Sequence, residues 1–80
     1  MAEKNMQQLV QFMAQSLVSE PDKVNVSVTE GPDAVIMELN VAPDDMGKVI
    51  GKQGRIAKAI RSVVKAATAK GEKSVFVEIQ

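Results

Sequence analysis

The 80-residue sequence contains no cysteine, no histidine, and only two aromatic residues, Phe12 and Phe76. Without cysteine the chain has no disulfide, no thiolate nucleophile and no cysteine metal site. Without histidine it lacks the commonest general base and metal ligand, so we predict no enzyme, no metal site and no cofactor. Two aromatic side chains are also too few for the base-stacking platforms of RRM or single-strand-binding proteins.

Long apolar runs are missing as well. The N-terminal stretch MAEKNMQQLVQF has no uninterrupted apolar segment of the kind a signal peptide needs. No run approaches the length of a membrane span, and we expect a cytoplasmic protein. Eighty residues correspond to one domain, 1–80. A core of this size disfavours a deep cavity and favours binding at the surface.

The formal net charge is zero, but the charges are unevenly distributed along the chain. Residues 1–47 contain two basic and eight acidic residues, a net of −6. Residues 48–73 contain eight basic residues and one acidic residue, a net of +7. This asymmetry predicts one basic face for an anionic partner, with the remaining surface acidic.

Periodicity of the apolar residues indicates alternating helices and strands. Spacings of three and four predict helices, and strict alternation predicts strands with one buried face. Proline at 21 and glycine at 71 are the expected stops of the two longer helices. The expected elements are a helix at about 4–18, strands at 23–29 and 34–41, a short helix at 42–50, a helix at about 55–70 and a strand at 74–79. This order predicts an α+β fold, αββααβ, with a three-stranded sheet and helices on one face.

Two glycines bracket a Lys-Gln pair at 51–54, between the short and the long predicted helices. Glycine lets a backbone approach a ligand closely, and the N-terminus of the following helix favours a phosphate. The segment is not a P-loop, because only three residues separate Gly47 from Gly51 and Gln53 stands where Ser or Thr would bind magnesium. The alternative is a plain turn between helices, which has no need for Lys52 and its basic neighbours.

The stretch VIGKQGRIAKAIR resembles the V-I-G-K-x-G-x-x-I-x-x-I signature of KH domains, whose G-x-x-G loop clamps about four nucleotides of a single strand. The predicted element order is similar to that of the type II, or prokaryotic, KH fold, with a core motif at about 34–80. The chain length and the phrase DDMGKVIGKQGRIAKAI resemble the KhpA (YlqC-like) family of small bacterial KH proteins. The resemblance implies non-catalytic, cytoplasmic binding of single-stranded RNA, as a global RNA-binding protein or RNA chaperone.

The resemblance also implies which residues contact RNA. The loop matches the element that approaches the sugar-phosphate backbone, and the flanking helices supply apolar groove residues and charges. One departure is that Ala57 occupies the first isoleucine position of the signature, while Ile56 stands one residue early. Ile56 is therefore either a groove residue or a contact for a partner. The predicted RNA-binding residues are Lys48, Val49, Ile50, Gly51, Lys52, Gln53, Gly54, Arg55, Ile56 and Lys58.

Two of these assignments have structural alternatives. A short helix must bury something, so one of Val49 and Ile50 is expected in the core. On a wheel of the long helix, one face carries Ile56, Ile60, Val63 and Ala67, and the other carries Arg55, Lys58, Arg61 and Lys65. Such a charged face is commonly just solvated, but this one has no acid to form i,i+4 pairs. We assign Arg55 and Lys58, with Lys48 and Lys52, to RNA, and place Arg61 and Lys65 closer to the solvated alternative.

A partner surface is the remaining prediction. Three apolar residues are expected off the inward faces and Ile56 joins them as a candidate, since a weak binder with a short footprint gains from dimerisation. They are Phe12, Ile36, Ile56 and Phe76. The family resemblance implies a homodimer or a complex with a larger Jag-type KH protein, KhpB. The alternative function is therefore a protein-interaction module whose RNA binding depends on such a partner.

Overall fold

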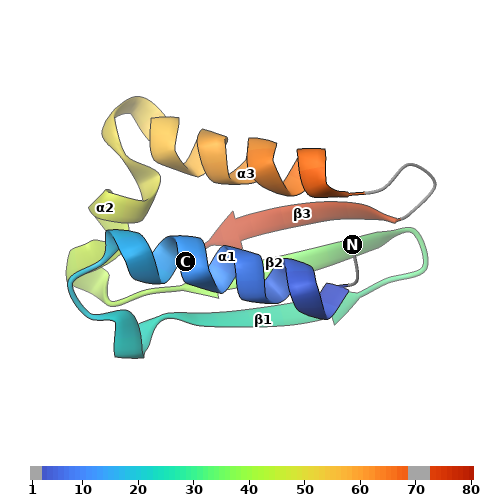
Figure 1. The fold of residues 1–80 in the computed structure, drawn as a ribbon, viewed down its shortest axis with the longest axis horizontal. Coiled ribbons are helices and arrows are strands. Elements are labelled where there is room, and N and C mark those ends of the chain that lie inside the picture. Colours follow the sequence, from blue (N-terminus) through green and yellow to red (C-terminus); the bar gives the residue numbers. More distant parts are fainter. Residues whose placement is uncertain (1–2, 69–72) are drawn as a thin grey trace.

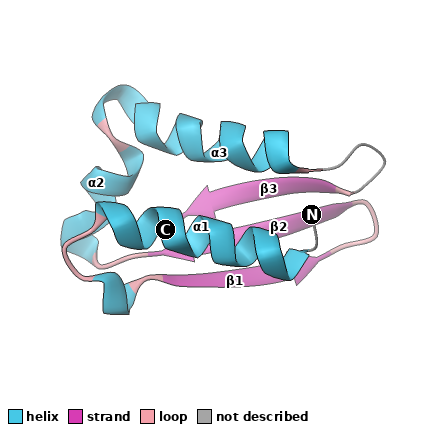
Figure 2. Cartoon of the chain, in the orientation of Figure 1, coloured by secondary structure: helices cyan, strands magenta, loops and turns pink. Residues whose placement is uncertain are grey.

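The fold was analysed in a computed structural model that describes residues 3–68 and 73–80. The elements follow the predicted order. They are helix α1 (Glu3–Leu17), strands β1 (Asn25–Glu30) and β2 (Ala34–Asn40), helix α2 (Met46–Ile50), helix α3 (Arg55–Ala67) and strand β3 (Ser74–Ile79). Short 3-10 turns at 21–23, 43–45 and 52–54 join them. Helices α1 and α3 lie side by side over one face of the sheet, which makes two layers (Figures 1 and 2).

The sheet has the strand order β1-β2-β3, and its pairing is mixed. Strands β1 and β2 form an antiparallel hairpin, whereas β2 and β3 run parallel. A parallel pair needs a long crossover, and α2, the loop and α3 provide it. Strand β2 is therefore central, and β3 is an edge strand with one side of its backbone outside the ladder.

The core lies between the sheet and the two long helices. Alternate residues of β2 point into it, and Val35, Met37 and Leu39 are all at most 1% exposed. Helix α1 contributes Met6, Val10 and Ala14, four residues apart, because that spacing returns to the same side of a helix. Each of the larger side chains gains about 1.5–3 kcal/mol by leaving water. The predicted one-sided patterns of α1 and the strands are confirmed.

The predicted face of α3 is partly wrong. Its core residues are Ala57, Ile60 and Val64, whereas Val63 is 43% exposed. Helix α3 packs against both the sheet and α1, so its buried stripe is rotated by about one residue from the predicted face. Helix α3 also ends at Ala67, earlier than predicted, where Thr68 adopts an extended conformation. The predicted stop at Gly71 lies outside the described residues.

Candidate nucleic-acid interface

The loop at 51–54 connects α2 to α3 at one end of the molecule (Figure 1). Three of its residues have positive φ: Gly51 at 77°, Gln53 at 59° and Gly54 at 73°. The N–H of Gly54 donates to the carbonyl of Gly51 at 3.1 Å, which closes the turn. Left-handed geometry is costly for most residues, so the two glycines permit this turn and Gln53 tolerates it.

The two glycines differ in their surroundings. A Cβ built on Gly51 would collide with Ile56, whereas one on Gly54 would meet no atom within 4 Å. Gly51 is therefore required by packing as well as by conformation, and Gly54 by conformation alone. Open space beside Gly54 leaves the outer side of the loop accessible to a ligand.

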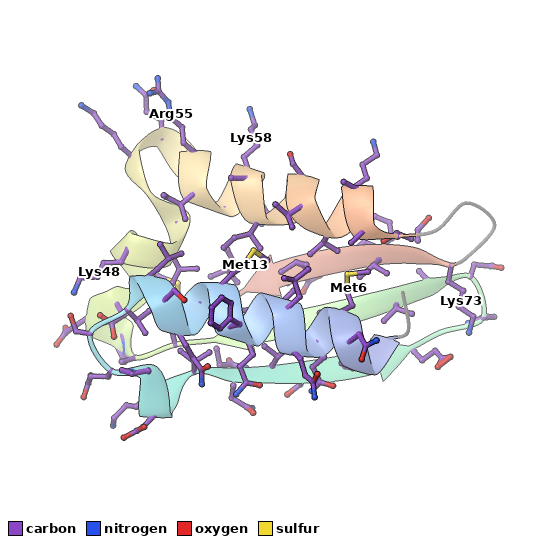
Figure 3. All side chains as sticks on the ribbon, in the orientation of Figure 1. Met6, Met13, Lys48, Arg55, Lys58 and Lys73 are labelled. Carbon is purple, nitrogen blue, oxygen red and sulfur yellow. The ribbon has the colours of Figure 1, made fainter. Side chains whose placement is uncertain are left out.

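Cations and polar groups surround the loop on its outer side. Lys52, Gln53, Arg55 and Lys58 are all exposed. Arg55 donates from Nη2 to Oε1 of Gln53 at 3.2 Å, so the two side chains are held together. Figure 3 shows Arg55 and Lys58 projecting from the same side of α3, away from the sheet.

Lys48 is placed differently from the other predicted cations (Figure 3). Its ammonium lies 3.4 Å from Oδ1 of Asp45 and donates to the hydroxyl of Ser19. Asp45 is only 1% exposed and accepts hydrogen bonds from the backbone N–H groups of Ser19 at 3.1 Å and Glu20 at 3.0 Å. The hydrogen bond from Ser19 is the main cause of a lowered pKa of Asp45, with Glu20 and Lys48 adding to it against the opposing effect of burial. Lys48 is thus partly neutralised.

The apolar residues beside the loop divide between core and surface. Val49 is fully buried, and Ile50 is 37% exposed. The prediction that one member of this pair belongs to the core is confirmed, and Val49 offers no surface to a base in this conformation. Ile56 is partly buried against the core, and its neighbour Ala57 is 4% exposed.

A groove between α3 and β3 was not predicted from the sequence. It has a volume of about 410 Å³ and is lined by Arg61, Lys65, Thr68 and residues 74–77. Arg61 donates from Nε to the carbonyl of Val77 at 3.2 Å, on the edge strand. Arg61 is exposed, as expected for the solvated side of α3, and this hydrogen bond also connects it to the edge strand. The absence of acids on α3 was the sequence signal that could have pointed to this groove.

A second, shallower groove lies between α1 and α3. Its lining is almost wholly apolar and consists of Phe12, Met13, Ser16, Leu17, Ile56, Ala59, Ile60 and Val63. Phe12 is 67% exposed, the largest exposed fraction among the large apolar side chains of the described residues. Ile56 belongs to this groove and does not line the groove beside β3.

The other two predicted partner residues lie elsewhere. Ile36 and Phe76 are register partners across β2 and β3, and they point to the face of the sheet that the helices leave uncovered. Phe76 is 55% exposed. The four predicted partner residues therefore form two separate surfaces, one between the helices and one on the sheet.

Among residues 3–68 and 73–80, no helix is long and apolar enough to cross a membrane. The same residues contain no group of three or more acidic, histidine or cysteine side chains placed to hold a metal ion.

A G-x-x-G loop between a short and a long helix, on a three-stranded mixed sheet, defines a KH domain of the type II order. Residues 7–79 match the family model described as KhpA/KhpB, KH domain, and the chain belongs to that family. The family is one of non-catalytic RNA-binding proteins, which agrees with the prediction that the chain is not an enzyme.

Several relatives are similar over nearly their whole length. The RNA-binding protein KhpA of Clostridium acetobutylicum is 62% identical over 74 residues, which cover 92% of this chain and 99% of the relative. Those of Clostridium perfringens and Caldanaerobacter subterraneus are 60% and 58% identical, with the same coverage.

Solved structures of Era share the fold. A variant of Era from Aquifex aeolicus bound to GDP and AlF4⁻ matches with a TM-score of 0.64 and 20% identity, over 95% of this chain and 31% of that one. Era in complex with MgGDPNP and nucleotides 1506–1542 of 16S ribosomal RNA matches with a TM-score of 0.63 and 20% identity, over 94% and 30% of the two chains. This chain thus spans about a third of Era.

Proposed function

We propose that the protein binds single-stranded RNA, with the sugar-phosphate backbone held against the loop at 51–54. The observation that carries the proposal is the loop itself, whose positive-φ glycines leave its outer side open beside Lys52 and Arg55. A phosphate there would meet exposed cations and the positive end of the α3 dipole. The names of the similar KhpA proteins support the same ligand.

The bases would lie in the groove between α3 and β3. Helix α3 leads from the loop to this groove, and Arg61 follows Arg55 by about 9 Å at 1.5 Å per residue. Edge strand β3 offers backbone groups outside the ladder, which suit hydrogen bonds to base edges. Ile50 adds an exposed aliphatic contact beside the loop. Aliphatic contacts and few aromatics predict modest affinity, because a stacked aromatic contributes about 1–3 kcal/mol per base.

Many RNAs rather than one are the expected targets. Contacts to the sugar-phosphate backbone position a protein but carry no sequence information. The loop and its cations would therefore accept unrelated sequences, as a global RNA-binding protein or RNA chaperone does. Similar affinities for unrelated short oligomers, together with faster annealing of complementary strands, are the expected results. A single sequence bound far more tightly than all others would contradict this part of the proposal.

Fluorescence anisotropy with short, unstructured RNA and DNA oligomers at several salt concentrations tests the binding itself. The wild type should bind RNA, more weakly at high salt because neutralised phosphates release counterions. A Lys52→Asp, Gln53→Asp double variant should lose binding. The matched control is Lys23→Asp, Gln15→Asp, which makes the same charge change at exposed positions away from the loop. Wild-type affinity in the folded loop variant would overturn the proposal.

A second candidate function is self-association, and the groove between α1 and α3 favours it. Phe12, Leu17 and Val63 are 67%, 37% and 43% exposed there, and no charged residue lines the groove. We infer a homodimer in which Phe12 of each copy enters the groove of the other, with a larger KhpB-type protein as the alternative occupant. The two candidate partner surfaces can be tested independently, because Phe12 lies in this groove and Phe76 lies on the uncovered face of the sheet.

Sedimentation velocity distinguishes these surfaces. Phe12→Lys should convert a dimer to a monomer, and Phe76→Lys, the matched control on the sheet, should leave it dimeric. A monomeric wild type at high concentration would contradict self-association and point to a different partner. A dimeric Phe12→Lys variant together with a monomeric Phe76→Lys variant would instead place the interface on the sheet.

A further inference from the structure

Asp45 is the most buried charged residue among those that the structure describes, and the proposed RNA contacts leave it unused. It is 1% exposed, and every buried side-chain polar atom described has a hydrogen-bond partner. A buried carboxylate is costly unless it is paired, so a residue of this kind is expected to hold something in place. Its position directly before α2 puts it six residues from the loop at 51–54.

The carboxylate joins two segments that are distant in sequence. Its two oxygens each accept one backbone N–H, Oδ1 from Ser19 at 3.1 Å and Oδ2 from Glu20 at 3.0 Å. Ser19 and Glu20 follow α1, which ends at Leu17. Asp45 therefore fastens the start of α2 to the end of α1, across 25 or more residues of chain.

Lys48 completes this arrangement one turn further along α2. Its ammonium bridges Oδ1 of Asp45, at 3.4 Å, and the hydroxyl of Ser19. Helix α2 has only five residues, which is too short to be stable without tertiary contacts. Its position relative to α1 depends on the buried Val49 and on this polar cluster. Since Gly51 directly follows α2, the orientation of α2 sets where the loop begins.

We propose that Asp45 is a positioning residue for RNA binding, which acts with Lys48 to hold α2 and so to preorganise the loop at 51–54. The inference rests on the proposed function. It assigns Lys48 to this cluster rather than to a phosphate contact. A preorganised loop binds more tightly because less ordering is needed on binding.

For the substitution Asp45→Asn, simple electrostatics predicts tighter RNA binding, whereas this proposal predicts weaker RNA binding. Asp45→Asn removes a negative charge near the RNA, which would tighten binding if only charge mattered. The amide nitrogen that replaces one oxygen cannot accept a backbone N–H, so the cluster is broken. We expect RNA affinity to fall about tenfold, the equivalent of one hydrogen bond of ordinary strength. Asp45→Glu keeps the charge but displaces the carboxylate, and it should also weaken binding.

Anisotropy titrations over a salt series test this with a short, unstructured RNA, after unfolding curves have shown each variant to be folded. The salt slope should stay at the wild-type value in Asp45→Asn and Lys48→Met, because neither removes a phosphate contact. Lys52→Met is the comparison, and its slope should fall by about 0.7. Unchanged or tighter binding by folded Asp45→Asn, or a reduced slope in Lys48→Met, overturns the proposal.

Two controls keep the result interpretable. If the Lys52→Asp, Gln53→Asp variant binds like the wild type, the proposed function fails; if it does not bind and the Asp45 variants bind normally, only this inference fails. If the Asp45 variants do not fold, amide hydrogen exchange of the wild type tests whether Asp45 holds the Ser19 and Glu20 amides. The Ser19 and Glu20 amides should then be protected to the same degree as those of α2, and free exchange at both would overturn the proposal.

Discussion

A Cβ atom on Gly51 would lie 2.2 Å from Cγ1 of Ile56. The backbone of Gly51 therefore lies directly against the side chain of Ile56. Because Gly51 begins the loop and Ile56 is in the first turn of α3, the loop packs closely on that helix. Ile56 thereby has a structural role on the loop side as well as a place in the groove between α1 and α3. Whether Ile56 also contacts a base stays a prediction.

Alanine at the two loop glycines should have unequal effects on stability. Gly51→Ala combines a collision with Ile56 and a backbone of φ 77° and ψ 172°, so we expect a loss of about 2–5 kcal/mol. Gly54→Ala meets open space and keeps only the left-handed penalty, about 1–2 kcal/mol. Urea unfolding curves measure both. Equal losses would mean that the contact with Ile56 does not constrain Gly51.

Substitutions at two adjacent residues of α2, Val49 and Ile50, should have different effects on stability and on RNA binding. Val49→Ala removes buried methyl groups and should cost about 2 kcal/mol of unfolding free energy. Ile50→Ala trims a partly exposed side chain, so it should cost less than about 1 kcal/mol but weaken RNA binding. Thermal unfolding and anisotropy on the same samples compare the pair. If Ile50→Ala binds RNA like the wild type, Ile50 makes no base contact.

Arg61 should affect RNA binding more than stability. Arg61→Met keeps much of the aliphatic stem and removes the hydrogen bond to Val77, at a cost of about 1 kcal/mol. If phosphates reach the groove beside β3, the salt slope of RNA binding should also fall by about 0.7. Lys23→Met, which removes a cation outside both grooves, is the control. A slope equal to that of the wild type would leave Arg61 with only its bond to the edge strand.

Acid should remove the contribution of Asp45 to stability. Its pKa in the folded protein is lower than the ordinary 3.8, chiefly because the Ser19 N–H stabilises the carboxylate. The contribution is therefore complete above pH 3.8 and is lost as the pH falls through the lower, folded-state pKa. Unfolding free energies of the wild type and Asp45→Asn should differ most near neutral pH and converge in acid. A difference independent of pH would show that ionisation of Asp45 contributes nothing.

The elements and the loop were predictable because each depends on local patterns. Alternation in β2 predicts a strand with one buried face, and the residues of that face, such as Met37, are buried. Gly51 and Gly54 indicate positive φ from the sequence alone, because few other residues adopt that conformation without strain.

Tertiary structure alone decided which surfaces those elements create. The rotation of α3 about its axis is set by packing on the sheet, and a shift of one residue exposes Val63 and turns Arg61 towards β3. The carboxylate of Asp45, which pairs with Lys48, is also held by the backbone N–H groups of Ser19 and Glu20, residues far away in the chain. A sequence period specifies which residues share a face, whereas the neighbour that each face meets depends on how distant segments pack.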